Sequence, residues 1–533
     1  MAQQASEPKH AERFFINVLW NWFAVGVSLI IGFYLTRFLI RKLTDEQYGV
    51  WVLAFSLIEY VSLFDLGFRS AIVNFLSHLR VQQDSRGMNE VVSTALAYFL
   101  GIATVAIVLS LTVAGQGYRA FTISPANRGN FSFLLMLVGF IWAGSIVSGI
   151  FQASLEAFQA FGVCNKILVG TVLIRSASCL LVLSLGYGLR WLGCCTLLAQ
   201  ASGWIMFYVA SRRIIPELKI GRSYVRAARW REMAKYGLGS VFANIGTLFL
   251  TNGPPLVVAH YLSATFAGYY RLPFTLLNYM VDVIARIGFV TAPKTAELWA
   301  QGMRAQIGRL GTRLNRYCFA LFLPPSIFLF VYGHSVLTAW LGKPEFVSQC
   351  APLLPVFTIA VSLAISAQFN SYSMLFGMAK QAPFAVSVII ESILALVGMA
   401  FVLPRYGILG GACVSASLMV ANRGLITPYI VCRELPYSYF RYMGSIYVRP
   451  LLCGLPLAGL AFWMRSSWLP GQTVLQLVFA AVLIISLGLL LALVFCVEPE
   501  HRLIVRDTLL KRLGMGPAEL PEAASELSKV HLS

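Results

Sequence analysis

Long apolar runs follow one another almost without pause along this chain of 533 residues. A transmembrane helix needs roughly 20 consecutive apolar residues, and runs of about that length recur from residue 14 to residue 497. In water such contiguous runs would create exposed apolar patches, which soluble proteins avoid. Only 12% of the residues are charged, against about 25% in an ordinary soluble domain. The chain is therefore predicted to be an all-α integral membrane protein.

The apolar runs predict about fourteen transmembrane helices. The first run is too long for the apolar region of a signal peptide and lacks a small-residue cleavage site, so we expect it to be retained. The expected spans are 14–40, 49–68, 91–114, 131–155, 165–189, 191–211, 236–261, 267–291, 314–341, 350–376, 383–403, 407–432, 446–464 and 472–497.

Lysine and arginine in the loops predict the orientation of the chain. Alternate loops are rich in these residues, whereas the loops between them hold few. Since basic loops stay in the cytoplasm, both termini are predicted to be cytoplasmic in a multi-pass plasma-membrane protein. Topology and anionic lipid headgroups also explain the net charge of +19. Nucleic acid is therefore not expected as a partner.

Two segments outside the expected spans combine basic with apolar side chains, one in the middle of the chain and one at its end. Residues 212–235 alternate basic with apolar and aromatic side chains, which favours an amphipathic helix on the cytoplasmic surface. The tail from residue 498 begins with a similar pattern. The sequence therefore predicts five segments: 1–211 (first lobe, helices 1–6), 212–235 (basic amphipathic linker), 236–432 (second lobe, helices 7–12), 433–497 (helices 13 and 14) and 498–533 (cytoplasmic tail).

Short motifs recur at an offset of 219 residues. The loop 43–49 resembles 262–268, and the triplet 187–189 resembles 406–408. Six helices separate the copies, so both copies enter the membrane from the same side. Such a parallel repeat, related by an axis along the membrane normal, is a known transporter arrangement with its binding site between the halves near the midplane.

These motifs also carry a family resemblance. The first loop Leu43–Gly49 (LTDEQYG), Asp65–Gly67 and Tyr406–Ala412 (YGILGGA) resemble the bacterial polysaccharide biosynthesis flippases of the multidrug/oligosaccharidyl-lipid/polysaccharide superfamily. The resemblance implies flipping of undecaprenyl-diphosphate-linked oligosaccharide to the outer face of the membrane by alternating access, in many cases with an ion gradient. The implied partners are that lipid-linked oligosaccharide, membrane lipids, and the polymerase and glycosyltransferases of polysaccharide (exopolysaccharide) synthesis.

Ionisable residues inside the spans are candidate site residues, because each costs roughly 3 kcal/mol at the bilayer centre. Arginine prevails among them, and its planar guanidinium matches phosphate oxygens and stays charged. Such a set favours an anionic, diphosphate-bearing substrate over a cation. The candidates for substrate binding are Arg175, Arg271, Arg286 and Arg423. The candidates for binding a coupling proton or sodium ion are Glu59, Asp282 and Glu391.

Structural roles remain open for several of these residues. Asp282 and Arg286 are four residues apart and would neutralise each other on one helix. Arg271 lies close to a span start and would reach the interface by snorkelling. Pro254 and Pro255 interrupt the seventh span, and we expect a functional hinge there because proline removes helical hydrogen bonds.

The sequence lacks the patterns of an enzyme. It has no phosphate-binding GxxxxGK[ST] loop, no Ser/His/Asp set with credible spacing and no zinc-type Cys/His spacing. No catalytic residue, metal or cofactor is expected. Two alternatives stay open: an ion-coupled drug exporter of the same superfamily, in which cavity carboxylates would dominate, and a membrane enzyme acting on lipid-linked glycans. The second would need a large outer loop, yet the longest expected one spans only about 115–130.

Overall fold

A computed structural model describes residues 26, 29–60, 63, 67–288, 291–503 and 506. Within these ranges every regular element is a helix, and the predicted all-α class is confirmed. The chain divides into two compact units. The first comprises residues 1–279, 340–353 and 382–418, and the second comprises 280–339, 354–381 and 419–533. Because these units cut across the repeat, the lobe boundaries expected from the sequence stay a prediction.

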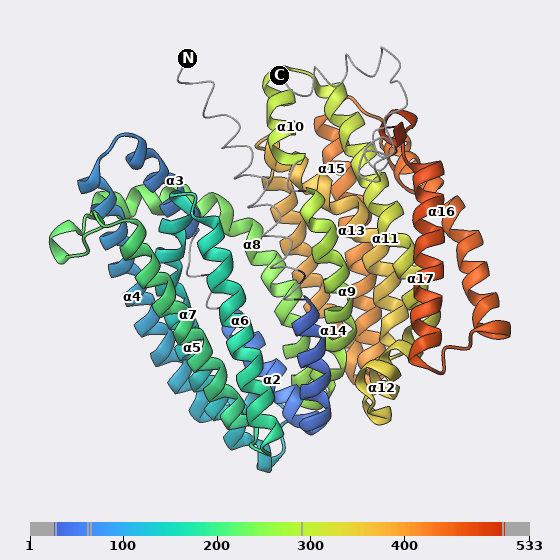
Figure 1. The fold of residues 1–533 in the computed structure, drawn as a ribbon, viewed down its shortest axis with the longest axis horizontal. Helices are drawn as coiled ribbons and strands as arrows, with labels where there is room; N and C mark the ends of the chain where they lie inside the picture. The colour runs from blue at the N-terminus through green and yellow to red at the C-terminus, as the bar shows by residue number, and fades with distance from the viewer. Residues whose placement is uncertain are drawn as a thin grey trace. The chain divides into compact units, whose positions relative to one another are not determined.

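The first unit begins with a helix over residues 29–42. Its next helices are α2 (Asp45–Ile58), α3 (Phe68–Val81), α4 (Ser85–Gln116), α5 (Pro125–Ala157), α6 (Phe161–Ser184), α7 (Leu189–Ile214) and α8 (Ala227–Tyr261). α5 packs against α4 and α7, and α6 packs against α7 (Figure 1). The unit also holds the start of α9 (Ala264–Gly288), the short α12 (Pro344–Cys350) and nearly all of α14 (Ala382–Met419).

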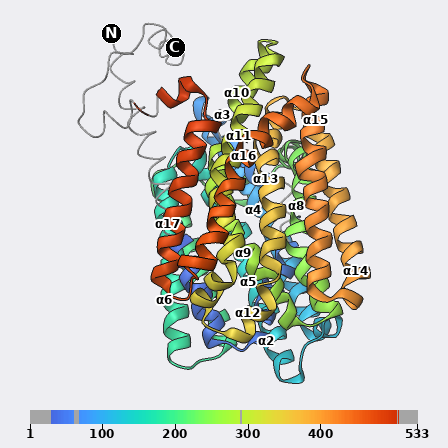
Figure 2. The same cartoon turned by 90° about the vertical axis from the view of Figure 1, so that its right-hand side faces the viewer.

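The second unit holds α10 (Thr291–Ala300), most of α11 (Arg304–Leu341) and most of α13 (Leu353–Gly377). A π-helical turn over Val420–Ile426 leads into α15 (Thr427–Glu434). α16 (Tyr439–Trp463) and α17 (Val474–Leu491) pack side by side (Figure 2).

Eight helices in the described part of the chain are long and apolar enough to cross a membrane, or nine if the bent pair α12–α13 forms one span. The protein is therefore a multi-pass membrane protein. Within the expected second span, α2 ends at Ile58 and α3 starts after Gly67, whose φ of 69° suits glycine. The first expected span lies partly outside the described residues.

The 219-residue offset extends to three pairs of helix starts. It relates α2 to α9 (45 and 264), α4 to α11 (85 and 304) and α5 to α12 (125 and 344). It also relates two turn residues with positive φ, Gln83 at 54° and Gly302 at 72°. Two short motifs thus predicted a repeat of whole helices.

The basic linker differs from the expected amphipathic helix. α7 continues to Ile214, only a single 3-10 turn follows at Arg222–Tyr224, and α8 begins at Ala227. The linker is held across the start of α4, where Asn89, Ser93 and Thr94 accept hydrogen bonds from linker backbone N–H groups. Buried side-chain acceptors on α4 thus replace the hydrogen bonds that a linker helix would have supplied.

Candidate functional site

Arg271 on α9 is one of three residues that the sequence singled out and that the structure brings together. Its Nη1 donates a 2.6 Å hydrogen bond to the backbone carbonyl of Thr251 on α8. In a regular helix this carbonyl would accept the N–H of residue 255, but Pro255 has none. The proline therefore supplies the acceptor that holds the arginine.

Glu59 completes this cluster from the end of α2. It lies close enough to Arg271 for the two charges to interact. The Glu59 side chain is exposed, whereas that of Arg271 is half-buried. The structure thus brings together a predicted substrate residue, a predicted ion-coupling residue and one predicted hinge proline.

Aromatic rings and a close helix contact surround the cluster. Tyr60, next to Glu59, packs edge-on against Phe249 of α8 at 5.0 Å between ring centroids. The Tyr270 hydroxyl donates to Ser415 on α14 at 3.0 Å. Gly253 lets α8 approach this region, since a Cβ there would lie 2.6 Å from Leu396 and 3.2 Å from the Tyr60 hydroxyl.

α8 runs as one continuous helix through both predicted hinge prolines, Pro254 and Pro255, which are buried. Two glycines of α8, Gly246 and Gly253, face residues 388–396 of α14. Glu391 lies in that stretch of α14 and is 3% exposed. The hinge role of the prolines and the ion-coupling role of Glu391 stay predictions.

Loops that the sequence predicts to lie on the outer side form a second cluster, which we call the outer latch: Arg41, Asp45, Glu46, Ser124, Asn127, Tyr269 and Lys343. Lys343 forms an ion pair with Asp45, and the Tyr269 hydroxyl donates to the same carboxylate at 2.6 Å. Arg41 donates to the Leu341 carbonyl at 2.8 Å. These contacts tie the first repeat copy to the second.

Glu46 anchors the latch within the first copy. Its carboxylate accepts from the Ser124 backbone N–H at 2.6 Å, and from the Ser124 hydroxyl and the Asn127 amide at 2.7 Å each. Burial alone would raise the pKa of Glu46, but these hydrogen bonds outweigh it and lower the pKa below its ordinary value of 4.5. Glu46 is therefore ionised at neutral pH.

The two repeat copies meet at their matching glycines. A Cβ on Gly49 of α2 would overlap the Ala264 carbonyl at the start of α9, and a Cβ on Gly268 would lie 3.4 Å from the Gly49 Cα. The contacts around them are reciprocal: Arg41 binds the loop before α12, and its 219-residue counterpart His260 binds the Ala120 carbonyl before α5 at 2.7 Å. The sequence predicted the repeat but not this contact.

Arg175 lies at mid-helix on α6, which packs against α7 and α5. Its side chain is half-buried, and its Nε is enclosed without a hydrogen-bond partner in the described structure. The neighbouring Ser176 hydroxyl is enclosed and unpartnered in the same way. No contact of the described residues brings Arg175 to the Arg271 cluster, so its substrate role stays a prediction.

The remaining candidates belong to the second unit. Arg423 is half-buried in the π-helical turn, a geometry that recurs at functional sites. Asp282 on α9 is exposed. The Arg286 side chain lies outside the described residues, so the expected pairing with Asp282 is untested.

A buried polar network in the second unit was not singled out as a site from the sequence. The Asn315 amide on α11 donates to the Tyr442 hydroxyl on α16 at 2.8 Å and to Ser371 on α13 at 3.2 Å. Thr291 on α10 donates to Asn370 on α13 at 2.8 Å. Interhelical hydrogen bonds of this kind hold membrane bundles together. We therefore interpret this network as structural.

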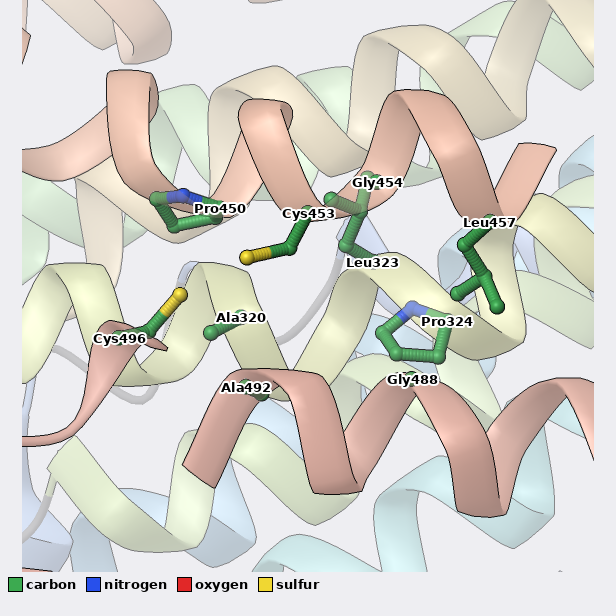
Figure 3. Close-up of a pocket in the computed structure, with 10 residues that line it drawn as sticks. All are labelled: Ala320, Leu323, Pro324, Pro450, Cys453, Gly454, Leu457, Gly488, Ala492 and Cys496. Carbon is green, nitrogen blue, oxygen red and sulfur yellow. The ribbon is translucent and has the colours of Figure 1, made fainter. Parts of the chain in front are cut away.

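A pocket between α11, α16 and α17 is too small for a substrate. Its volume is about 10 Å³, close to the minimum for one water molecule. Figure 3 shows it with Cys453 and Cys496 directed into the same apolar space. Its lining is Ala320, Leu323, Pro324, Pro450, Cys453, Gly454, Leu457, Gly488, Ala492 and Cys496. In the described part of the chain, no three His, Cys, Asp or Glu side chains gather to hold a metal ion.

Comparisons with known proteins agree with this architecture. A model of the family described as polysaccharide biosynthesis protein matches residues 38–344. The putative O-antigen transporter of Shigella flexneri is 21% identical in an alignment over 431 residues that covers 78% of this chain and 97% of that protein.

Solved structures share the fold. The lipid II flippase MurJ in an inward closed conformation aligns with a TM-score of 0.69 at 11% identity, covering 94% of this chain and 99% of that one. An inward-facing multidrug resistance MATE family transporter of the MOP superfamily gives a TM-score of 0.59 at 11% identity, covering 77% and 94%. At such identities these similarities concern the fold alone.

Proposed function

Because the chain belongs to the polysaccharide biosynthesis protein family, we propose that it flips undecaprenyl-diphosphate-linked oligosaccharide from the cytoplasmic to the outer face of the plasma membrane. Both termini would lie in the cytoplasm, as the basic loops predict. The lipid-linked oligosaccharide is the proposed substrate, supplied by glycosyltransferases and consumed by a polymerase. The observation that carries this proposal is the Arg271 guanidinium, held by a carbonyl that a proline has released.

The cluster has the chemistry to bind and release a diphosphate. A guanidinium has five N–H donors, of which one bonds to Thr251. Glu59 is a rival anion for the same charge. A diphosphate that enters would compete with Glu59 for Arg271, and a proton that binds Glu59 would favour the substrate. Glu59 is thus our first choice for the ion-coupling residue, with Asp282 and Glu391 as further candidates.

The outer latch supports alternating access. It would close the outer side while substrate enters from the cytoplasm, and it would open when the diphosphate has displaced Glu59. Pro254 and Pro255 would let α8 bend between these states. Arg175, Arg286 and Arg423 would provide further positive charge along the path.

Replacing Arg271 tests the proposal. In cells that depend on this protein, Arg271→Ala should lower polysaccharide output roughly 10- to 150-fold, because a charged hydrogen-bonded contact contributes about 1.5–3 kcal/mol. Lipid-linked oligosaccharide should accumulate on the cytoplasmic face. Arg271→Lys should restore part of the output, since lysine keeps the charge but not the bidentate geometry.

Val52 provides a matched control. It is buried on α2, 219 residues before Arg271, so Val52→Ala trims a side chain at the equivalent position without removing a charge. Its output should stay close to that of the wild type. Full polysaccharide output from Arg271→Ala at normal protein level would overturn the assigned role. An unchanged lipid pool with new sensitivity to organic cations would point to the drug exporter instead.

A further inference from the structure

An apolar groove runs along one face of α4. Its residues are separate from those of the Arg271 cluster. Its volume is about 420 Å³. Its lining is Ala97, Tyr98, Gly101, Ile102, Val105, Ala106 and Leu109. These residues are apolar apart from the Tyr98 hydroxyl. From residue 97 to residue 109 a helix rises about 18 Å, which is comparable to the roughly 15 Å depth of one leaflet's hydrocarbon.

A cluster of arginines lies next to the inner end of this groove. Glu90, two turns before Tyr98 on α4, attracts Arg86, Arg226 and Arg229 at 3.6–3.7 Å. Thr94, one turn before Tyr98, accepts the backbone N–H of Arg226 at 3.0 Å. Residues spaced by four lie on one face of a helix, so the arginine cluster and the groove share a face of α4.

Trp230 connects the two features. Its ring lies 6.1 Å from that of Tyr98, which lines the groove. The linker segment 212–235 contributes eight basic and only two acidic side chains. One of the acids, Glu232, pairs with Arg229 at 3.0 Å. Even when Glu90 is counted with these two acids, the basic side chains beside the apolar groove remain in large excess.

We propose that this groove and the arginine cluster form a binding site for an anionic glycerophospholipid of the cytoplasmic leaflet. The headgroup phosphate would lie against Arg226 and Arg229, where guanidinium donors suit phosphate oxygens. One acyl chain would follow α4 from Tyr98 to Leu109, and Trp230 would sit at the interfacial level that tryptophan favours. Among the described residues that line the groove, Tyr98 offers the single hydroxyl, which suits a hydrocarbon chain and not an oligosaccharide.

Filling the groove tests this site. A Cβ on Gly101 would meet no atom within 4 Å, so Gly101→Phe should fold and occupy the groove. The matched control is Val108→Phe, because Val108 is 56% exposed on α4 but does not line the groove. The full-length protein would be reconstituted in nanodiscs of phosphatidylcholine with increasing phosphatidylglycerol. Bound lipid would then be counted by native mass spectrometry.

The wild type and Val108→Phe should retain phosphatidylglycerol at least fivefold better than phosphatidylcholine. Gly101→Phe should lose most of this retention, and Arg226→Gln with Arg229→Gln should lose the preference for the anionic lipid. Equal retention by Gly101→Phe and Val108→Phe, or equal retention of the two lipids by the wild type, would overturn the proposal. Displacement of phosphatidylglycerol by equimolar undecaprenyl diphosphate would likewise overturn it, and would assign the groove to a prenyl chain. Arg271→Ala should bind phosphatidylglycerol normally, which separates this site from the proposed transport function.

Discussion

α2 and α9 occupy equivalent places in the two repeat copies and meet at Gly49 and Gly268, yet they carry different charges. The position equivalent to Arg271 on α9 is the buried Val52 on α2. The position equivalent to Glu59 is Asn278. The guanidinium and the carboxylate of the candidate site thus come from different copies. The repeated part is the backbone scaffold, and the chemistry depends on where the copies differ.

The same contrast holds elsewhere in the chain. α5 runs unbroken from Pro125, whereas its counterpart is split into α12 and α13, bent by 46°. The offset pairs Arg175 with Leu394, Glu391 with Val172 and Arg423 with Trp204. None of the charged site candidates at these positions recurs in the other copy. Equivalent positions of the two copies can therefore differ in charge.

The largest expected effect concerns the glycine contact between the copies. Gly49→Ala should destabilise the protein by about 3 kcal/mol, the upper end for overpacking, because its Cβ would overlap the Ala264 backbone carbonyl. Gly268→Ala should cost about 1 kcal/mol, since its Cβ would meet the Tyr48 ring at 3.0 Å, which can give way slightly. Thermal unfolding of the purified variants would check this order. Equal melting temperatures of the two variants would contradict the prediction that Gly49 is packed more tightly than Gly268.

A smaller effect is expected at the turn that opens the last helix of each copy. Gly407 has φ 62° and ψ −160°, a conformation almost restricted to glycine, so Gly407→Ala should cost about 2 kcal/mol. Its counterpart Gly188 has φ −88° and ψ −169°, which any residue adopts, so Gly188→Ala should be nearly neutral. A Cβ would meet no atom within 4 Å at either position, so only backbone conformation should separate the two. Melting temperatures would test this pair, and a loss of stability in Gly188→Ala alone would contradict it.

The smallest expected effect is the pH response of the outer latch. The hydrogen bonds that lower the pKa of Glu46 stabilise its charged form in the folded protein. The unfolded chain titrates near 4.5, so this stabilisation is complete above that pH and is lost as the pH falls through the lower folded pKa. Glu46→Gln should lower stability by about 1 kcal/mol at neutral pH and should flatten the loss of stability as the pH falls below 4.5.

Glu345→Gln is the control for this titration, because Glu345 is an exposed carboxylate in the first turn of α12. Melting temperatures of the wild type and both variants would be measured across the acid range. A Glu46→Gln curve that coincides with the wild-type curve at every pH would show that the latch carboxylate does not contribute. The counterpart of Glu46 in the second copy is Thr265, so we expect no similar titration from that copy.

Much of the fold was predictable because its determinants are local. Helix starts coincide with chemical signals in the sequence: Thr44 caps α2 together with Gln47, Asp84 caps α4, and Pro125 and Pro344 open α5 and α12. The site was only partly predictable. The cost of a charge in the membrane singled out Glu59 and Arg271, and the loss of helical hydrogen bonds singled out Pro255. Neither argument gave a reason to group these residues, and the first gave Arg175 equal weight. Asp45 and Lys343 were missed because charges in loops carry no such cost.

By itself the sequence determined a chain of apolar helices, its two related copies and the set of ionisable residues within its apolar runs. Hydropathy, caps and a fixed offset are properties of neighbouring residues or of the chain numbering, so they can be obtained without coordinates. Only the tertiary structure decided that Pro255 frees a carbonyl for Arg271, that the Glu59 and Arg271 charges interact, and that the linker crosses the start of α4. Those outcomes depend on the rotation of each helix about its axis and on which helices become neighbours, and hydropathy carries neither.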